Sequence, residues 1–253
     1  QPVDVHFISF DDIIENKIDI DQYDVLVNTG LEGSSFQGDF YWKNEALLTK
    51  IRRYVANGGG FLGIGNPSGY FYQGKYFQLA DILGVEKELG FTYCKNKFFP
   101  EENKKHWIIS DIHMENVHFV PCHQMVYPTG AEVLCCVFNE NDPTQNTNQG
   151  GNVRLAVHEY GKGRAVYLSG LFDSFDAFRL IYKTLLWASH KEADYQKALS
   201  SNPNVDCYYY ENTGSYALLN NLGEEEKTIF YDIHGKPSEM TLKGHEIRWI
   251  PKE

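Results

Sequence analysis

The stretch "GGGFLGIGNPSGYF", residues 58–71, has the form of a turn that presents a nucleophile. A short apolar strand leads into a tight glycine–proline turn. Many α/β enzymes place a reactive side chain there, because helix N-terminal amides can stabilise an oxyanion. Aligned on "GI", the Cys of a G-I-C-x-G pattern is replaced here by Gly65, which has no side chain to attack with. Ser68 lies past the turn, so we do not expect it to be a nucleophile.

Two pairs of ionisable residues could also do chemistry. Asp173 and Asp176 are three residues apart and could serve as an acid and a base. They also stand at the start of an expected helix, where Asp caps the helix and offsets its dipole, and we favour that interpretation. His158 and Glu159 have the form of a remnant of a catalytic triad, but without a Cys at the turn they have nothing to activate.

Histidines and cysteines do not predict a metal or a disulfide framework. His113, His118 and His123 are spaced by five residues, and Cys122 stands beside the last of them. A zinc site needs ligands on one helical or strand face. This spacing does not supply one, so we expect no metal and no cofactor. Cys135 and Cys136 lie in an apolar strand, so their side chains point to opposite faces and fill the core.

The first two-thirds of the chain alternate strands and helices, which predicts a mostly parallel sheet with helices on its faces. Period and turn residues predict strands at 3–10, 23–30, 60–65 and 131–139, a hairpin over 154–171 that turns at "GKG", and helices at 44–60, 76–85 and 176–190. Residues 139–151 are polar and predict a surface loop. After a polar link, about five short strands predict a small antiparallel unit. We therefore expect an α/β domain over 1–192 and a β domain over 205–253.

Composition excludes several classes of partner. The 253 residues carry a formal net charge of -11, which disfavours nucleic acid, and no apolar run is long enough to span a bilayer. The 5 cysteines are scattered, as in a reduced cytoplasmic protein. The chain opens with "QPVDVHFISF", without Met or leader, so we expect a piece of a longer chain.

Three runs of sequence together carry a resemblance to a known family. They are "YDVLVNTGLEGSSFQGDFYW", "YVANGGGFLGIGNPSGYFYQGKYFQLADILGVEKELGFTY" and "GKGRAVYLSGL". They resemble the middle domain of the galactosyl-hexosamine phosphorylases of glycoside hydrolase family 112, which include the lacto-N-biose phosphorylases. The run "FQLADILGVEKE" after "GGGFLGIG" is the specific part, because the last run also resembles the trimerisation domain of family 42 β-galactosidases.

The resemblance implies a fold and a function. The fold is a glutamine-amidotransferase-like (flavodoxin-like) α/β domain that lacks the nucleophile, followed by a small antiparallel β domain. The family splits β-1,3-galactosyl-N-acetylhexosamine with phosphate into α-galactose 1-phosphate and N-acetylhexosamine, at a site on an N-terminal (β/α)8 barrel. That barrel is absent here, so the resemblance implies a non-catalytic scaffold that supports it, in a homodimer that meets galactosides and phosphate only through the parent active site. We carry over no catalytic residue.

Three polar residues could face a ligand or the missing barrel. Glu32 and Asn66 follow the carboxyl ends of expected parallel strands, where ligands of open α/β sheets bind, and Ser68 lies close by. Turn formation and capping explain the same residues without a ligand. The aromatic loop 33–42 favours a contact surface with another subunit over a carbohydrate cleft.

Two other functions stay open. The chain could be a stand-alone carbohydrate-binding or oligomerisation module without a parent enzyme. It could also be an amidotransferase-like hydrolase with an unusual nucleophile, Ser68 or Cys94.

Overall fold

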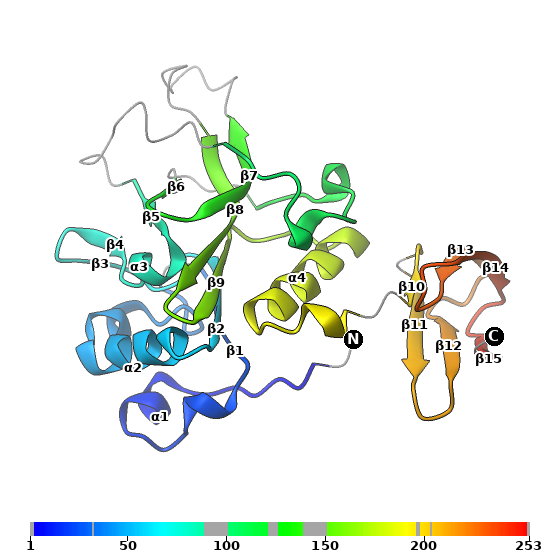
Figure 1. Ribbon diagram of the computed structural model, residues 1–253, viewed down its shortest axis with the longest axis horizontal. Coiled ribbons are helices and arrows are strands. Elements are labelled where there is room, and N and C mark those ends of the chain that lie inside the picture. The colour runs from blue at the N-terminus through cyan, green and yellow to red at the C-terminus, as the bar shows by residue number, and fades with distance from the viewer. Residues whose placement is uncertain are drawn as a thin grey trace.

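The computed structural model of the protein describes residues 3–31, 33–88, 101–120, 126–138, 151–195, 198–202 and 204–251. Figure 1 shows a larger body of helices around a sheet and a smaller unit of strands that follows it in the chain. The predicted loop over 139–151 falls almost wholly outside the described residues, as do Glu32, Cys94, Cys122 and His123.

The larger body is built on one five-stranded sheet in the order β1-β2-β9-β8-β7. Its strands are β1 Val25–Gly30, β2 Gly60–Gly65, β7 Glu132–Phe138, β8 Gly151–Tyr160 and β9 Gly163–Leu168. β1, β2 and β9 run parallel, whereas β8 pairs antiparallel with both β9 and β7. The sheet is therefore mixed rather than mostly parallel, because the tight turn at Gly161 sends β9 straight back beside β8.

Helices cover both faces of this sheet, as Figure 1 shows. They are α1 Phe10–Ile14, α2 Glu45–Ala56, α3 Ala80–Leu83 and α4 Phe175–Ala188. α2 and α3 bury one apolar cluster against the sheet, and α4 buries a second cluster on the opposite face. Helices therefore lie on both faces of the mixed sheet.

α2 illustrates why these segments fold locally. Leu47, Ile51 and Val55 recur at helical spacing and are buried, so one face of the helix packs on the sheet. Asn44 caps the first turn, since its Oδ1 accepts a hydrogen bond from the backbone N–H of Leu47 at 3.1 Å. The helix ends at Asn57, as the sequence predicts.

Two predicted elements are wrong. Residues 3–9 form no strand: Val5 and Phe7 are 67% and 87% exposed, and α1 begins after Ser9, whose side chain caps it. The period-two pattern is present, but no neighbouring strand accepts its hydrogen bonds. The helix predicted over 76–85 is reduced to the four residues of α3, because Lys75–Phe77 pairs with Gly69–Tyr72 in a hairpin.

Short elements complete the body. The two small antiparallel sheets pair β3 Gly69–Tyr72 with β4 Lys75–Phe77 and β5 Val85–Lys87 with β6 Val126–Pro128. The short 3-10 helices are η1 Ile20–Gln22, η2 Asp39–Lys43, η4 Trp107–Ile109, η5 Met114–Asn116 and η6 Glu192–Asp194.

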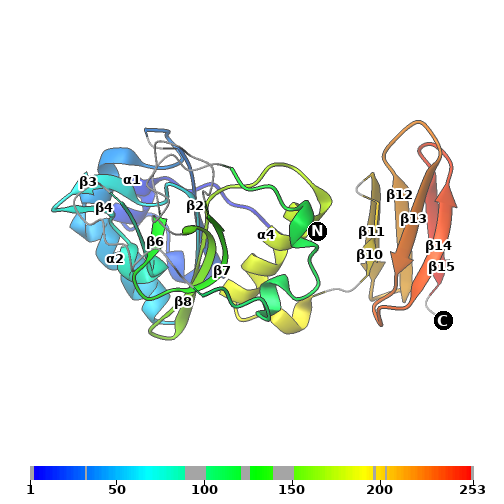
Figure 2. The same cartoon turned by 90° about the horizontal axis from the view of Figure 1, so that it is seen from above.

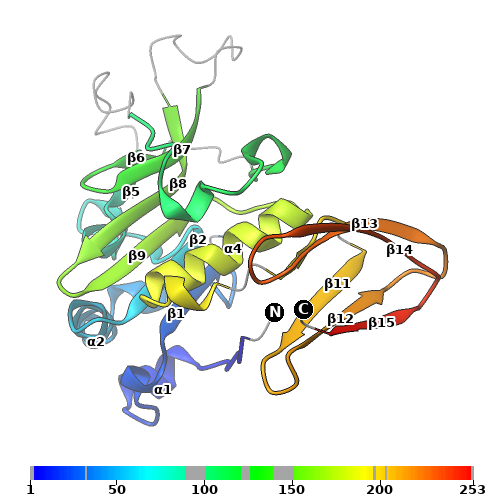
Figure 3. The ribbon, with the colours of Figure 1, turned by 45° about the vertical axis from the view of Figure 1, so that its right-hand side comes forward.

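The smaller unit consists of two three-stranded antiparallel sheets, which Figures 2 and 3 show from two sides. Its strands are β10 Leu199–Ser200, β11 Val205–Tyr210, β12 Ser215–Asn220, β13 Glu226–Tyr231, β14 Pro237–Leu242 and β15 Ile247–Pro251. β10, β13 and β14 form one sheet, and β11, β12 and β15 form the other. The unit has its own apolar cluster, which includes Val205, Leu218 and Phe230.

In the part of the chain that the structure describes, no helix is both long enough and apolar enough to cross a bilayer.

Candidate functional site

The parallel strands β1 and β2 end side by side at Gly30 and Gly65, where ligands of open α/β sheets bind. Asn66 follows, and its backbone N–H donates to the Gly30 carbonyl at 3.1 Å. The chain then enters β3, not a helix, so the strand–turn–helix geometry of a nucleophile-bearing turn is not formed. The Gly65 φ is +79°, and a Cβ there would lie 2.8 Å from the Gly30 carbonyl oxygen.

A network of buried amides ties the 33–42 loop to this turn. Gln37 has no exposed surface, and its Nε2 donates to the carbonyl oxygens of Asn66 and Gly69, while its Oε1 accepts from the Asp39 N–H at 2.8 Å. Asn28 on β1 donates to the Phe36 carbonyl at 2.9 Å and accepts from the Ser68 N–H at 2.9 Å. These contacts attach the loop to the turn, because buried amides that lose their partners are costly.

Ser68 does not face a ligand or an interface. Its side chain has no exposed surface, and its Oγ accepts a hydrogen bond from the Leu79 N–H at 3.1 Å. Its φ of +52° is unusual for a residue other than glycine, yet the hydroxyl holds the backbone and is not presented to solvent.

Asn66 keeps a partly exposed position at the end of β2. The ammonium group of Lys87 donates to its Oδ1 at 3.1 Å and lies 4.1 Å from the centre of the Tyr76 ring. The structure thus places Asn66 as predicted but gives its side chain a structural partner.

A pocket of about 300 Å³ is lined by Lys87, Glu86, Lys75 and Tyr127, among other residues. Burial raises the pKa of Glu86, although the backbone N–H groups of Phe77, Lys87 and Tyr76 and the charge of Lys75 oppose the shift. The N–H groups of Phe77 and Lys87 donate to Glu86 Oε1 at 2.9 and 2.8 Å. The carboxylate therefore ties β4 to β5.

The other sequence candidates are not brought together. Asp173 is exposed, whereas Asp176 is buried in the first turn of α4 and accepts from Asn116 at 3.0 Å. Asp176 lies in the first turn of α4, where a negative charge interacts favourably with the helix dipole, but the residue that caps the helix is Ser174. The two carboxylates therefore do not form an acid–base pair.

His158 and Glu159 point to separate partners. The Nδ1 of His158 lies 2.8 Å from the Ile82 carbonyl oxygen, and Glu159 is exposed beside Arg164. Within the described ranges, no three His, Cys, Asp or Glu side chains are grouped to hold a metal ion.

The cysteines of β7 lie as predicted. Cys136 is buried in the cluster under α2, and Cys135 packs against the cluster under α4, so adjacent residues serve opposite faces. Burial raises the pKa of Cys135 to about 11 and that of Cys136 to about 12. Both stay protonated at neutral pH, which suits a core residue and not a nucleophile.

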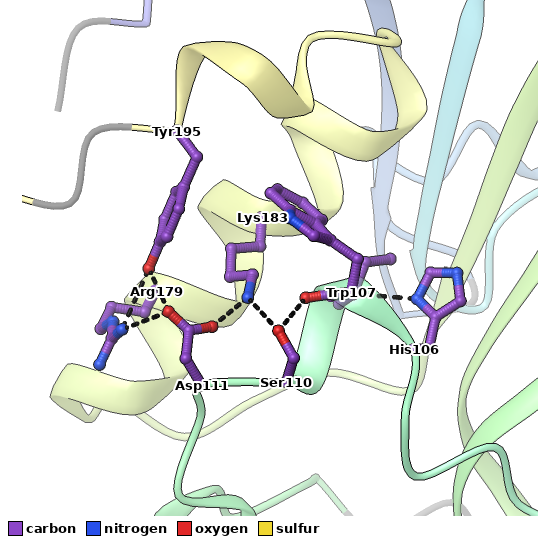
Figure 4. Close-up of polar contacts among 8 residues, drawn as sticks. His106, Trp107, Ser110, Asp111, Arg179, Lys183 and Tyr195 are labelled. Carbon is purple, nitrogen blue, oxygen red and sulfur yellow. Dashed lines mark hydrogen bonds and ion pairs between the residues drawn. The ribbon is translucent and has the colours of Figure 1, made fainter. Parts of the chain in front are cut away.

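A group of charged side chains beside α4 was missed from the sequence. Figure 4 shows Arg179, Lys183 and Tyr195 converging on Asp111, which follows η4. The Tyr195 hydroxyl donates to Asp111 at 2.9 Å, and Arg179 lies 2.9 Å from the same carboxylate oxygen. The side chain of Lys183 is 1% exposed, and its ammonium group forms an ion pair with the other carboxylate oxygen of Asp111.

Burial and ion pairing act in opposite directions on the two central groups of this charge cluster. Desolvation alone would raise the pKa of Asp111, but hydrogen bonds and charges from Lys183, Tyr195 and Arg179 outweigh it and lower the pKa. Desolvation lowers the pKa of Lys183, whose ammonium lies 4.7 Å from the Trp107 ring centre and 5.1 Å from that of Tyr195. Its carboxylate and aromatic neighbours compensate part of that cost.

The charge cluster has a structural use. It joins the 106–111 segment and Tyr195, which follows η6, to the middle of α4. Lys183 is too enclosed to react with a substrate. In the sequence, the charge cluster is indicated only by a Lys on the apolar face of an amphipathic helix. The sequence pattern does not indicate which residue pairs with it.

Comparison with known proteins identifies two successive regions. The family model described as lacto-N-biose phosphorylase central domain matches residues 1–193, and that described as lacto-N-biose phosphorylase C-terminal domain matches residues 199–250.

The relatives are similar in sequence but much longer. A 1,3-β-galactosyl-N-acetylhexosamine phosphorylase of Lachnoclostridium phytofermentans is 37% identical over 98% of this chain and 33% of its own. Its counterpart in Bifidobacterium longum is 34% identical over 98% and 36%. The chain thus spans about a third of the length of these relatives.

Among solved structures, a β-galactosidase from Halorubrum lacusprofundi aligns with 92% of this chain and 32% of its own, at 13% identity and a TM-score of 0.49. Because the central-domain model covers most of the chain, the protein belongs to the lacto-N-biose phosphorylase family and carries its central and C-terminal domains.

Proposed function

We propose that this chain is the non-catalytic portion of a phosphorylase that splits β-1,3-galactosyl-N-acetylhexosamines with inorganic phosphate. The names of the relatives support the reaction, and the family assignment supports the place of the chain within such an enzyme. The catalytic groups then belong to the part of the relatives that this chain does not match.

The reaction needs two groups in one place. A phosphate oxygen forms a bond to the anomeric carbon of galactose while the glycosidic C–O bond breaks, and a carboxylic acid gives its proton to the leaving oxygen. The products are galactose 1-phosphate and the free N-acetylhexosamine.

One observation carries the scaffold assignment. Where a reactive side chain would stand after β2, Gly65 adopts a φ of +79° and its missing Cβ would lie 2.8 Å from the Gly30 carbonyl oxygen. A side chain there would distort both strands, so this turn serves the backbone. The neighbouring hydroxyl of Ser68 is enclosed and already accepts a hydrogen bond.

The same proposal covers the architecture and the assembly. Parallel strands β1, β2 and β9 with helices on both faces support an amidotransferase-like body. The 33–42 loop presents Phe36 and Phe40, which are 65% and 53% exposed, as a surface for the catalytic part or a second subunit. The homodimer and the cytoplasmic location remain predictions.

Phosphorolysis is the direct test. Galacto-N-biose and phosphate are incubated with this chain, with the full-length parent enzyme, and with this chain plus the separately produced remainder of the parent. We expect galactose 1-phosphate from the parent and from the reconstituted mixture, and none from this chain alone. Product from this chain alone would place the acid within these residues and overturn the proposal.

A further inference from the structure

The sheet of β11, β12 and β15 presents aromatic side chains on its outer face. Side chains alternate between the two faces of a strand. The inner face supplies Val205, Leu218 and Ile250 to the apolar cluster of the unit. The outer face carries Tyr208 and Trp249, which are 40% and 59% exposed.

The strand register groups these rings around small residues of the central strand. Tyr208 and Trp249 are the two cross-strand neighbours of Ala217. Tyr210 is opposite Ser215, and its ring centre lies 5.3 Å from that of Trp249 at an interplanar angle of 40°. Neighbouring strands are about 4.8 Å apart, so these long side chains reach over the central strand, and Ala217 beneath them is buried.

Polar groups accompany the rings. Asp206 is on the same face two residues before Tyr208, and the Nδ2 of Asn221 donates to its carboxylate at 3.0 Å. The hydroxyls of Thr213 and Ser215 lie 2.6 Å apart at the end of the hairpin. Burial, and then the charge of Asp206 and a side-chain hydrogen bond to it, raise the pKa of Tyr208, so these two groups are coupled on the face.

The chemistry of the face distinguishes it from an inner core surface. Tyr and Trp combine a flat apolar ring with a polar tip, which suits a ligand that has C–H groups on one side and hydroxyls at its rim. A pyranose ring has this form. Its axial hydrogens pack on the ring face, and its hydroxyls reach acceptors such as Asp206.

Charge and size argue against other occupants. The chain carries a formal net charge of -11, so nucleic acid is repelled, whereas a neutral glycan is not. The exposed large side chains of this face are Tyr208, Tyr210, Ile247 and Trp249. A stable protein–protein interface needs about 20–30 residues on each side.

We propose that the outer face of β11, β12 and β15 binds a neutral oligosaccharide, with Tyr210 and Trp249 stacking on its sugar rings and Asp206 accepting hydroxyl hydrogen bonds. This site is additional to the phosphorolysis of the proposed function and does not depend on it. It would hold glycan close to the enzyme without cleaving it.

Calorimetric titration of this chain tests the site, with galacto-N-biose, lactose and cellobiose as probes. We expect dissociation constants of about 1–10 mM for at least one probe, as befits an open face with few contacts. Trp249→Ala and Tyr210→Ala should each weaken binding about tenfold or more, and Trp249→Phe should retain most of it because the stacking surface remains.

Phe71→Ala is the matched control, because Phe71 is an aromatic residue on β3 with a similar exposure of 57%. It should bind as the unaltered chain does. No binding of any probe, or equal binding by Trp249→Ala, overturns the proposal. A sedimentation shift from dimer to monomer in Trp249→Ala without any sugar binding would identify a protein interface and overturn it as well. Circular dichroism verifies that each variant folds. Since no phosphate is present, the outcome is independent of the phosphorolysis test.

Discussion

Gly65 ends β2 with a φ of +79°, in a region that side-chain-bearing residues rarely adopt. A Cβ at this position would approach the Gly30 carbonyl oxygen to 2.8 Å, and that atom belongs to the neighbouring strand and cannot rotate away. Both the positive φ and the close approach of the Gly30 carbonyl oxygen therefore require a glycine at position 65.

Gly65→Ala should lower the free energy of unfolding by about 1–3 kcal/mol, the usual cost of a strained backbone position. Gly223→Ala is the control, because Gly223 is not among the positive-φ glycines and its Cβ would meet nothing nearer than 3.5 Å. The control should be neutral or slightly stabilising. Urea denaturation measures both, and equal effects would refute the steric account.

Asp111 should set part of the acid stability of the protein. Its folded pKa lies below the ordinary value of 3.8, so the unfolded chain binds more protons there. The stabilising contribution is complete above that value and is lost as the pH falls through the folded pKa. Asp111→Asn removes this pH dependence and leaves the buried Lys183 without a counter-charge.

At neutral pH we expect Asp111→Asn to lower the free energy of unfolding by about 1–3 kcal/mol. The lower figure is typical of an exposed ion pair and the higher one of a buried pair. Asp24→Asn breaks the exposed pair with Lys191 and should change the unfolding free energy by less than about 0.5 kcal/mol. Denaturation at a series of pH values compares the variants. If the free energy of unfolding of Asp111→Asn fell with decreasing pH as steeply as that of the unaltered chain, the assignment would be contradicted.

At the scale of elements, the 33–42 loop depends on side-chain amides and not on a strand or a long helix. Gln37 connects the loop to the turn after β2, and the side chain of Trp42, at the end of the loop, is buried. The loop can therefore present Phe36 and Phe40 without a regular framework of its own.

Gln37→Ala should cost about 2–4 kcal/mol, because it leaves buried carbonyl groups without donors and opens a cavity. The Asp39 amide, which donates to Gln37 Oε1, should exchange with solvent faster in hydrogen-exchange measurements. Gln22→Ala, which removes an exposed hydrogen bond to Asp19, should change neither quantity measurably. Unaltered exchange at Asp39 would show that the loop is held by other contacts.

At the scale of the whole molecule, the two matched regions have separate cores. The buried residues of the body's clusters lie between 13 and 188, and those of the smaller unit's cluster lie between 198 and 242. Regions with their own cores unfold as separate cooperative units.

A chain that ends after Tyr195 should keep the thermal midpoint of the larger unfolding transition within a few degrees, because it retains both clusters of the body and the Asp111 contacts. Differential scanning calorimetry should show two transitions in the whole chain and one in the shortened chain. Loss of the cooperative transition on shortening would mean that the smaller unit completes the fold of the body.

Local patterns in the sequence were sufficient for much of this protein. The apolar spacing of α2, the runs of β1 and β2, and the glycine turn between β8 and β9 depend on neighbouring residues, and each lies where it was predicted. The family motifs, too, are continuous stretches of chain, and the family assignment is confirmed.

What only the tertiary structure decided are the features that need distant partners. A strand forms only where another strand accepts its hydrogen bonds, so the alternating pattern of residues 3–8 was not sufficient. Ser68 was turned inward by Asn28 and Leu79, and Lys183 was enclosed by Asp111, 72 residues away in the chain. Burial and pairing of this kind are set by which surfaces meet in space, and local spacing carries no information about that.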